Sequence, residues 1–211
     1  MLQNLFTGKT VLFQGDSITD CGRDRISDDL GAGYPALIAQ IYRCLYPDSG
    51  TKFINRGISG NRSAELLARY EEDILLPKPD FISILIGIND TWRRYDSCDP
   101  TSAEQYEDNY RRILSGIRRD LPGTQILVIE PFLLPTDPEK ECWHEDLDPK
   151  IGVARKLARE YADFFLPMDG IFQKLLVDGV SSKAFSEDGV HPTPAGHAAI
   201  CRAYLQLLGL I

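Results

Sequence analysis

The sequence lacks the features that would place cysteine or metal chemistry at its centre. Its five cysteines are odd in number and widely scattered, and no two of them form a Cys-x-x-Cys pair. This pattern argues against a disulfide framework and against a structural zinc site. Unpaired thiols are typical of proteins that stay in a reducing compartment, so we predict a cytoplasmic protein.

Long apolar runs and a basic surface are missing as well. No window approaches the roughly 18 consecutive apolar residues that a membrane span requires. Residues 1–15 contain only one basic residue and do not resemble a secretory signal peptide. The net charge is −8 and the paired arginines lie among acidic residues, whereas nucleic-acid-binding proteins usually present a basic face. We therefore expect neither a membrane nor a nucleic acid as a partner.

What the sequence does contain is an alternation of short apolar runs and amphipathic segments. A chain of 211 residues with 43% hydrophobic and 26% charged residues has the size and composition of one globular domain, here residues 1–211. Several runs rich in branched and aromatic residues have the length and composition of strands that are covered on both faces. These predicted strands are Val11–Phe13, Lys52–Ile54, Phe81–Ile86, Ile126–Ile129 and Phe164–Leu166.

Helical patterns fill the intervals between these runs. Apolar residues lie on one helix face at positions 106, 110, 113, 114 and 117, and again at 151, 154, 157, 158 and 161. Helix starts are marked by capping residues at Thr101 with Glu104, at Asp148 before Pro149, and at Thr193 before Pro194. Such alternation predicts an α/β protein, a three-layer α/β/α sandwich with a five-stranded parallel sheet. The long irregular segment 131–148 is either a substrate-side loop or a solvated excursion.

Polar and glycine-containing clusters follow the predicted strands. Residues 15–17 (Gly-Asp-Ser) follow the first strand, residues 57–61 (Gly-Ile-Ser-Gly-Asn) the second, and residues 87–90 (Gly-Ile-Asn-Asp) the third. A fourth segment, residues 188–191 (Asp-Gly-Val-His), lies just before the last predicted helix. Ligands of open parallel sheets bind beyond the carboxyl ends of the strands. We therefore predict that the four segments converge on one edge of the sheet.

One of the histidines is placed to act as a base. Asp188 precedes His191 by three residues in the same loop, so its carboxylate can orient the imidazole and stabilise the imidazolium. A serine hydroxyl becomes a nucleophile only when a neighbouring base takes its proton, and an imidazole titrates near neutral pH. Ser17 supplies such a hydroxyl after the first strand. We predict Ser17, His191 and Asp188 as a catalytic triad for acyl transfer.

Acyl transfer also requires donors for the oxyanion of the tetrahedral intermediate. The predicted donors are the backbone N–H of Ser17, the backbone N–H of Gly60 and the side-chain amide of Asn89. Loss of one such donor typically costs roughly 2.7–4 kcal/mol of barrier. Glycine suits the second position because the backbone can approach the substrate closely without a Cβ. Gly57 is the alternative if the register differs.

Each residue also has an ordinary structural interpretation. A serine after a strand can cap a helix, and asparagine and glycine form turns; only their joint occurrence in this order favours catalysis. We expect Asp16 and Asp90 to bond neighbouring loop amides without a catalytic role. We expect His197 to pack in the last helix or lie at the surface, and His144 to lie in a loop.

The four segments together resemble the GDSL-type, or SGNH, hydrolase family, named for its serine, glycine, asparagine and histidine. Matched motif to motif, the family's nucleophile falls on Ser17 and its oxyanion residues on Gly60 and Asn89. Its acid and base fall on Asp188 and His191. The motifs lie within residues 15–192 and so cover nearly the whole chain.

Residues 15–23, 55–61 and 87–93 are further similar to the intracellular bacterial acetylesterases that deacetylate xylo-oligosaccharides. This resemblance implies a flavodoxin-like fold, an acetylated carbohydrate as the substrate, no metal or organic cofactor, and a homo-oligomer. Within this interpretation, Trp92 could offer a flat face to a sugar ring, or could simply pack against a neighbouring helix or subunit. Arg93 or Tyr95 could add hydrogen bonds to the substrate.

The leading hypothesis is a serine esterase that removes acetyl groups from a small carbohydrate through an acyl-enzyme. A lysophospholipase or thioesterase of the same family is the alternative, and it would need a longer apolar acyl channel. The short polar loops around Ser17 and Asn89 favour a small acyl group. A non-catalytic carbohydrate-binding protein on the same fold is the third possibility, although the chain retains a residue for every catalytic role.

Overall fold

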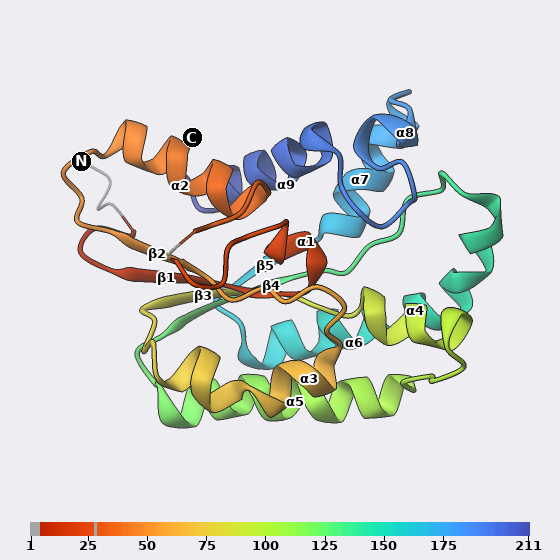
Figure 1. Ribbon diagram of the computed structural model, residues 1–211, viewed down its shortest axis with the longest axis horizontal. Coiled ribbons are helices and arrows are strands. Elements are labelled where there is room, and N and C mark those ends of the chain that lie inside the picture. The colour runs from red at the N-terminus through yellow and green to blue at the C-terminus, as the bar shows by residue number, and fades with distance from the viewer. Residues whose placement is uncertain (1–4, 28) are drawn as a thin grey trace.

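The computed structural model describes residues 5–27 and 29–211, and a parallel sheet lies at its centre (Figure 1). The five strands pair in the order β2-β1-β3-β4-β5, and every pairing is parallel. Their bounds are β1 Thr10–Gly15, β2 Lys52–Asn55, β3 Phe81–Leu85, β4 Gln125–Ile129 and β5 Phe164–Leu166. Each predicted strand is therefore confirmed, with ends that differ by two residues at most.

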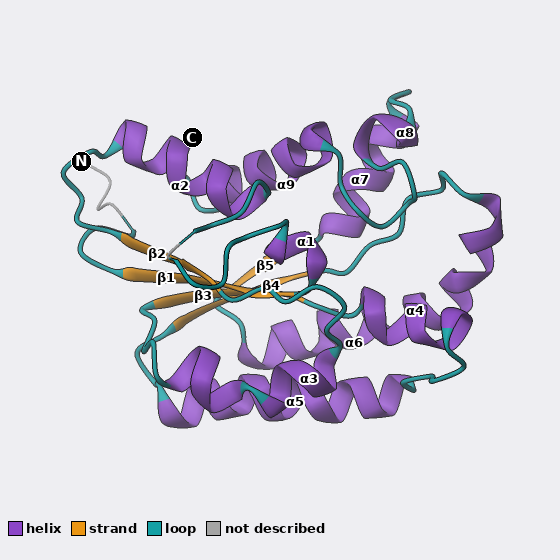
Figure 2. Cartoon of the chain, in the orientation of Figure 1, coloured by secondary structure: helices purple, strands orange, loops and turns teal. Residues whose placement is uncertain are grey.

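Helices cover both faces of the sheet, which confirms the predicted three-layer α/β/α sandwich (Figures 1 and 2). On one face lie α2 Tyr34–Leu45, α7 Met168–Val177, α8 Ser182–Phe185 and α9 Pro194–Leu207. On the other face lie α3 Ser63–Ala68, the π-helical turn η1 Glu71–Leu75, α5 Ala103–Asp120 and α6 His144–Tyr161. The remaining helices, α1 Ser17–Asp20, α4 Ile88–Asp96 and the 3-10 helix η2 Pro138–Trp143, lie at the carboxyl end of the strands.

Successive residues of β1 pack into two separate hydrophobic cores. Val11 and Phe13 join the core under α2, α7 and α9, whereas Leu12 joins the core under α3, α5 and α6. All three side chains are fully buried. Burial on both faces is the reason that residues 11–13 are apolar in succession instead of alternating with polar residues.

The strand order reverses between β1 and β3, because the chain passes through β2 before it returns to the other side of β1. Ser17 follows β1 and Asn89 lies in the first turn of α4, directly after β3. In doubly wound sheets this reversal opens the crevice in which ligands bind. The topology therefore places both predicted site residues at the crevice.

The predicted helix starts have different outcomes. Thr193 caps α9 by accepting a hydrogen bond from the N–H of Gly196 at 3.1 Å, as expected. The capping box of α5 is shifted by one residue, because Ser102 and Gln105 bond each other's backbone in place of the predicted pair. The start at Asp148 is wrong, because α6 begins at His144 and continues through Pro149.

The segment 131–148 is less irregular than its sequence predicts. Residues 138–143 form η2, and α6 follows without interruption from His144. The expectation of a loop around His144 is therefore wrong. Burial of Leu147 and Ile151 stabilises this first part of α6 and offsets the helix hydrogen bond that Pro149 cannot make.

Within residues 5–27 and 29–211, no helix combines the length and the hydropathy that crossing a bilayer would require.

Candidate active site

The turn after β1 presents Ser17 at the start of α1. Asp16 is the N-cap of this helix, and its Oδ1 accepts a hydrogen bond from the N–H of Ile18 at 3.0 Å. Ser17 is half-buried, and among the described residues nothing accepts a hydrogen bond from its own N–H. Gly15 permits this tight turn because a Cβ there would lie 2.4 Å from the carbonyl oxygen of Leu85.

The hydroxyl of Ser17, the imidazole of His191 and the carboxylate of Asp188 form a continuous hydrogen-bonded relay. The Oγ of Ser17 lies 3.0 Å from the Nε2 of His191, and the Nδ1 of His191 lies 2.7 Å from the Oδ2 of Asp188. The other carboxylate oxygen of Asp188 accepts hydrogen bonds from the N–H groups of Val190 and His191 at 2.9 and 2.8 Å. Asp188 thus stabilises the conformation of the loop and also orients the imidazole of His191 in that loop.

The charges of this relay determine which ring nitrogen carries the proton. Partial burial alone would raise the pKa of Asp188, but hydrogen bonds from His191 and the loop backbone hold it well below its usual range. An ionised carboxylate only accepts, so the Nδ1 of His191 donates and the Nε2 is free to take a proton from Ser17. The hydrogen bond to Asp188 raises the pKa of His191 above its ordinary value.

The two candidate glycines of the loop after β2 differ in what their N–H groups do. The N–H of Gly57 donates to the Oδ1 of Asn55 at 2.8 Å, and a Cβ at this position would lie 2.3 Å from the backbone nitrogen of Asp20. Gly60 adopts a φ of +81°, and within the described residues its N–H has no acceptor. The N–H that remains available to a ligand is therefore that of Gly60.

Asn89 is buried at the start of α4 and faces the same loop. Its Nδ2 donates one hydrogen bond to the carbonyl oxygen of Asn61 at 3.1 Å. A carboxamide nitrogen carries two hydrogens, so the second remains available to a ligand. The bond fixes the orientation of the amide relative to Gly60, one residue before Asn61.

Arg69 is a residue of this site that sequence reasoning missed. Its side chain is only 13% exposed and donates to the Oδ1 of Asn61 at 2.8 Å and to the carbonyl oxygen of Arg56 at 2.8 Å. It also donates to the carbonyl oxygen of Gly15 at 3.3 Å and forms an ion pair with Asp73. One guanidinium thus connects the end of β1 with the loop after β2. Nothing in the local sequence around Arg69 signals these contacts.

Asp16 and Asp90 form the structural hydrogen bonds that the sequence predicts. Asp90 accepts from the N–H of Ser63 at 3.0 Å and from its hydroxyl at 2.5 Å, which caps α3. Burial raises the pKa of Asp90 to about 6 and that of Asp16 to about 7. The Oδ2 of Asp16 is buried and has no hydrogen-bond partner among the described residues.

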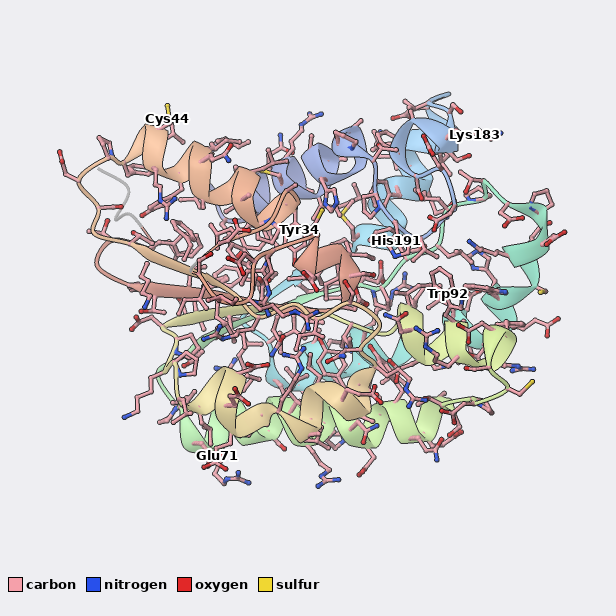
Figure 3. All side chains as sticks on the ribbon, viewed as in Figure 1. Tyr34, Cys44, Glu71, Trp92, Lys183 and His191 are labelled. Atoms are coloured by element: carbon pink, nitrogen blue, oxygen red, sulfur yellow. The ribbon has the colours of Figure 1, made fainter. Side chains whose placement is uncertain are left out.

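Of the three predicted substrate-side residues, Trp92 borders the relay and Arg93 borders the loop after β2. The indole of Trp92 lies 5.6 Å from the ring of His191, measured between centroids, and the two ring planes are tilted by 54°. Figure 3 labels both residues. A terminal nitrogen of Arg93 would lie 3.5 Å from a Cβ at Gly60, so this guanidinium borders the loop after β2. Tyr95 instead stacks on Trp143 at 5.1 Å and donates to the carbonyl oxygen of Cys142 at 3.1 Å.

The other histidines have hydrogen-bond partners outside the relay. His197 is buried in α9, where its Nδ1 accepts a hydrogen bond from the N–H of Tyr34 at 3.2 Å. Burial lowers the pKa of His197 to about 4, so it is neutral at physiological pH and packs as expected. His144 bonds Asp148 within α6 at 2.9 Å.

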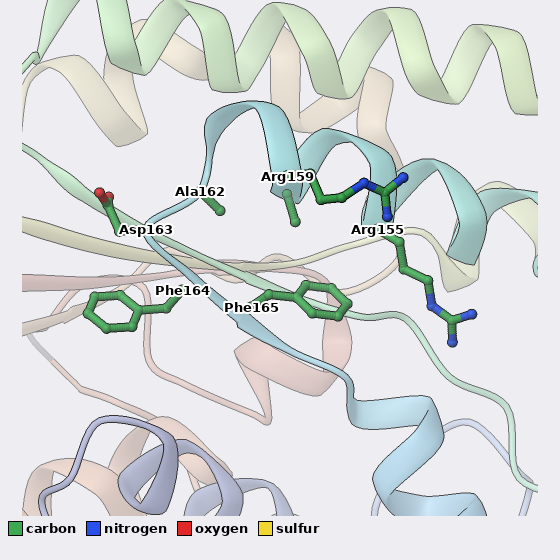
Figure 4. Close-up of a pocket in the computed structure, with 7 residues that line it drawn as sticks. Arg155, Arg159, Ala162, Asp163, Phe164 and Phe165 are labelled. Atoms are coloured by element: carbon green, nitrogen blue, oxygen red, sulfur yellow. The ribbon is translucent and has the colours of Figure 1, made fainter.

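Two cavities illustrate where ligands could bind. A cavity of about 440 Å³ opens beside the relay and is lined by Glu187, Asp188, His191, Pro192, Thr193 and Pro194. Another, of about 280 Å³, lies beside β5 and is lined by Arg155, Ala158, Arg159, Ala162, Asp163, Phe164 and Phe165 (Figure 4). The second cavity contains no hydroxyl, thiol or imidazole, so it offers no group for nucleophilic chemistry. The first is lined by two residues of the relay, Asp188 and His191, so it adjoins the candidate active site.

Comparison with known proteins agrees with this geometry. Residues 13–199 match the GDSL-like lipase/acylhydrolase family. The chain belongs to this family. The family resemblance noted from its motifs is thereby confirmed, and the matched residues include the segments that carry Ser17, Gly60, Asn89 and His191.

This GDSL-like acylhydrolase has relatives of nearly the same length. An acetylxylan esterase of Geobacillus stearothermophilus is 36% identical over 210 residues, which cover 96% of this chain and 95% of that protein. Its structure has a TM-score of 0.88, with 97% of this chain and 96% of that chain covered at 34% identity. A protein of Parabacteroides merdae described as a GDSL-like lipase has a TM-score of 0.92 at 36% identity, with 99% of both chains covered.

Variants of the Geobacillus enzyme are also informative. Three of its structures are described as catalytic mutants, in which a serine, an aspartate or a histidine is replaced by alanine. In that enzyme the aspartate and the histidine lie three positions apart.

Proposed function

We propose that this acylhydrolase is a serine esterase that removes acetyl groups from xylo-oligosaccharides or related small carbohydrates. The observation that carries the proposal is the relay in which the Oγ of Ser17, the imidazole of His191 and the carboxylate of Asp188 are joined at 3.0 and 2.7 Å. Residues of the same three types, with the same spacing of aspartate and histidine, are those altered in the catalytic mutants of the Geobacillus acetylxylan esterase.

In the acylation step, the Oγ of Ser17 attacks the acetyl carbonyl carbon while the Nε2 of His191 takes the hydroxyl proton. Negative charge develops on the carbonyl oxygen of the tetrahedral intermediate. The N–H groups of Ser17 and Gly60 and the free hydrogen of the Asn89 amide stabilise this charge, because they are fixed before the substrate arrives. The intermediate then collapses, and His191 gives its proton to the departing sugar oxygen.

Deacylation repeats these roles with water as the nucleophile. His191 takes a proton from the water, whose oxygen attacks the acetyl carbon of the ester on Ser17, and the same donors stabilise the second oxyanion. The collapse of this intermediate returns the proton to the Oγ of Ser17 and releases acetate. Asp188 remains ionised throughout and stabilises the imidazolium that forms in each half-reaction.

The surroundings of the relay support a short acyl group and a carbohydrate. The cavity beside His191 is lined by two carboxylates, an imidazole, a hydroxyl and two prolines, and none of these lining side chains is a long aliphatic one. The indole of Trp92 borders the imidazole and supplies an apolar face of the kind on which sugar rings stack. The name acetyl-xylooligosaccharide esterase, given to the Geobacillus relative, agrees with this substrate class. A homo-oligomer and a cytoplasmic location stay predictions.

The proposal is tested by acetate release from p-nitrophenyl acetate and from acetylated xylo-oligosaccharides. The wild-type protein should hydrolyse both, and Ser17→Ala should remove the activity and the labelling by a fluorophosphonate. Ser59→Ala is a matched control, because Ser59 lies in the neighbouring loop and its hydroxyl bonds Asp20 at 3.0 Å. Full activity in Ser17→Ala would refute the mechanism.

Chain length separates the proposed activity from the lysophospholipase or thioesterase alternative. Rates measured on p-nitrophenyl esters from acetyl to palmitoyl should fall steadily beyond the shortest chains. A maximum at long chains, or faster hydrolysis of lysophospholipids than of acetylated sugars, would overturn the substrate class and leave the relay intact. Binding of the sugars without hydrolysis by the wild-type protein would favour the non-catalytic alternative.

A further inference from the structure

The segment between β4 and α6 contacts the loop that carries the relay. The N–H of Leu134 donates to the carbonyl oxygen of Gly189 at 2.8 Å. The Nζ of Lys140, on η2, donates to the carbonyl oxygen of Asp188 at 2.6 Å. Residues 131–148, for which the sequence leaves open a substrate-side loop or a solvated segment, therefore form hydrogen bonds with two residues of the loop that orients His191.

Lys140 holds its ammonium between two indoles. Its Nζ lies 5.0 Å from the ring centroid of Trp92 and 5.4 Å from that of Trp143. The side chain is only 15% exposed, and the nearest carboxylate is that of Asp137 on the same turn, at 3.9 Å. Cation–π contacts with both rings and a hydrogen bond to a carbonyl oxygen thus fix a side chain that would otherwise be mobile.

The same indole that contacts Lys140 also contacts the imidazole. Trp92 lies 5.6 Å from His191 and 5.3 Å from Trp143, measured between ring centroids. Displacement of the ammonium would therefore affect His191 in two ways. It would release the carbonyl oxygen of Asp188 in the loop that carries His191, and it would free the indole of Trp92 that packs against the imidazole.

We propose that Lys140 is a positioning residue. It fixes the loop of residues 188–191 relative to Trp92 and so keeps the imidazole of His191 placed to act as a base. The proposal rests on the proposed function, in which His191 takes the proton of Ser17. Lys140 does not touch the reacting atoms, and its effect passes through the loop, the indole and its positive charge.

The charges that face His191 set the direction of this effect. The carboxylate of Asp188 in the same loop favours the imidazolium, and so does the ionised form of the buried Asp16 at the cap of α1, whereas Lys140 on η2 disfavours it. His197 on α9 also faces His191, but it is neutral at physiological pH because burial lowers its pKa. Removal of the Lys140 charge therefore raises the pKa of His191 further and makes the neutral base scarcer at low pH.

The protein contains an internal reporter for this titration. Its only two tryptophans are Trp92 and Trp143, and both pack around Lys140. A protonated imidazole beside Trp92 quenches indole fluorescence, so the emission of the whole protein should titrate with His191. His191→Gln should remove this transition. The readout needs no substrate and is independent of hydrolysis.

The experiment compares Lys140→Met with Lys140→Arg and with the matched control Lys174→Met. This control removes an exposed lysine of α7 that pairs with Asp178. In Lys140→Met we expect kcat/KM on p-nitrophenyl acetate to fall about tenfold at pH 6, because the higher pKa of His191 adds to the misplacement of the base. The fall should be smaller at pH 8.5, where only the misplacement remains. The acid limb of the activity profile and the fluorescence midpoint should both move to higher pH. Lys140→Arg should restore most of both properties, and Lys174→Met should match the wild type.

A wild-type pH profile and fluorescence midpoint in folded Lys140→Met would overturn the proposal, even if the variant were less stable. If Lys140→Met does not fold, Lys140→Gln retains a donor for the Asp188 carbonyl without the charge, and the same two midpoints decide. A failure of the proposed function would give a different result from a failure of the Lys140 proposal. In that case the wild-type protein does not hydrolyse the esters, whereas the fluorescence midpoints still report whether Lys140 acts on His191.

Discussion

Replacement of Asp16 by asparagine should stabilise the protein at alkaline pH. Asp16 is fully buried, and only its Oδ1 has a hydrogen-bond partner, the N–H of Ile18 at 3.0 Å. Burial raises its pKa from 3.8 to about 7. A group whose pKa is raised by folding contributes favourably below its unfolded pKa, and this contribution is lost as the pH rises through the folded pKa. At 1.36 kcal/mol per unit, the ionised group costs about 4 kcal/mol above pH 7.

Asparagine keeps the acceptor for Ile18 and carries no charge, so its contribution does not change with pH. Urea denaturation at pH 5 and at pH 8.5 measures the difference between Asp16→Asn and the wild type. We expect this difference to favour the variant by about 2–3 kcal/mol more at pH 8.5 than at pH 5. Asp48→Asn, the same substitution at an exposed surface position, is the matched control. An equal difference at both pH values would refute the reasoning.

Further predictions concern catalysis and the core. Asn89→Ala should lower kcat by about 10²–10³ with little change in KM, because the donor acts on the oxyanion; an effect confined to KM would contradict that role. Asp188→Asn should lower kcat/KM by about 10⁴, because an amide that donates to Nδ1 favours the tautomer in which Nε2 carries the proton. Retention of a tenth of the activity would exclude this role of Asp188. The acid limb of kcat/KM should lie above the ordinary histidine pKa of 6.5, because Asp188 raises the pKa of His191; a limb below 6.5 would count against it. Phe13→Ala should lower the free energy of unfolding by about 3–5 kcal/mol in urea titrations, and a loss under about 1 kcal/mol would argue against tight packing around Phe13.

The strands and the hydrogen-bonded relay could be predicted because their signals are local. A strand that is buried on both faces is a continuous apolar run, and the pairing of Asp188 with His191 lies within four consecutive residues. The contact between His191 and Ser17 spans 174 positions, yet it follows from the rule that the carboxyl ends of parallel strands share one edge.

The parts that could not be predicted depend on side chains that meet from distant segments. Arg69 reaches Gly15 across 54 positions and Lys140 reaches Asp188 across 48, and no motif marks either residue. The choice between the two glycines depends on the bond from Gly57 to Asn55, which only the folded loop reveals. The start of α6 could not be predicted, because packing of its apolar side chains outweighs the preference of Pro149 for the first turn of a helix.

Arg69 has a consequence for how substitutions in this site combine. Its guanidinium bonds the backbone of Gly15, two residues before the nucleophile, and also the side chain of Asn61, beside the oxyanion loop's Gly60. Movements of these two segments are therefore correlated, and a substitution that displaces one segment also displaces the other. Substitutions made singly on either side should not add in a double-mutant cycle, whereas they should become additive once Arg69 is replaced. The coupling energy between Ser17 and the loop that carries Gly60 thus depends on Arg69, a side chain outside the relay.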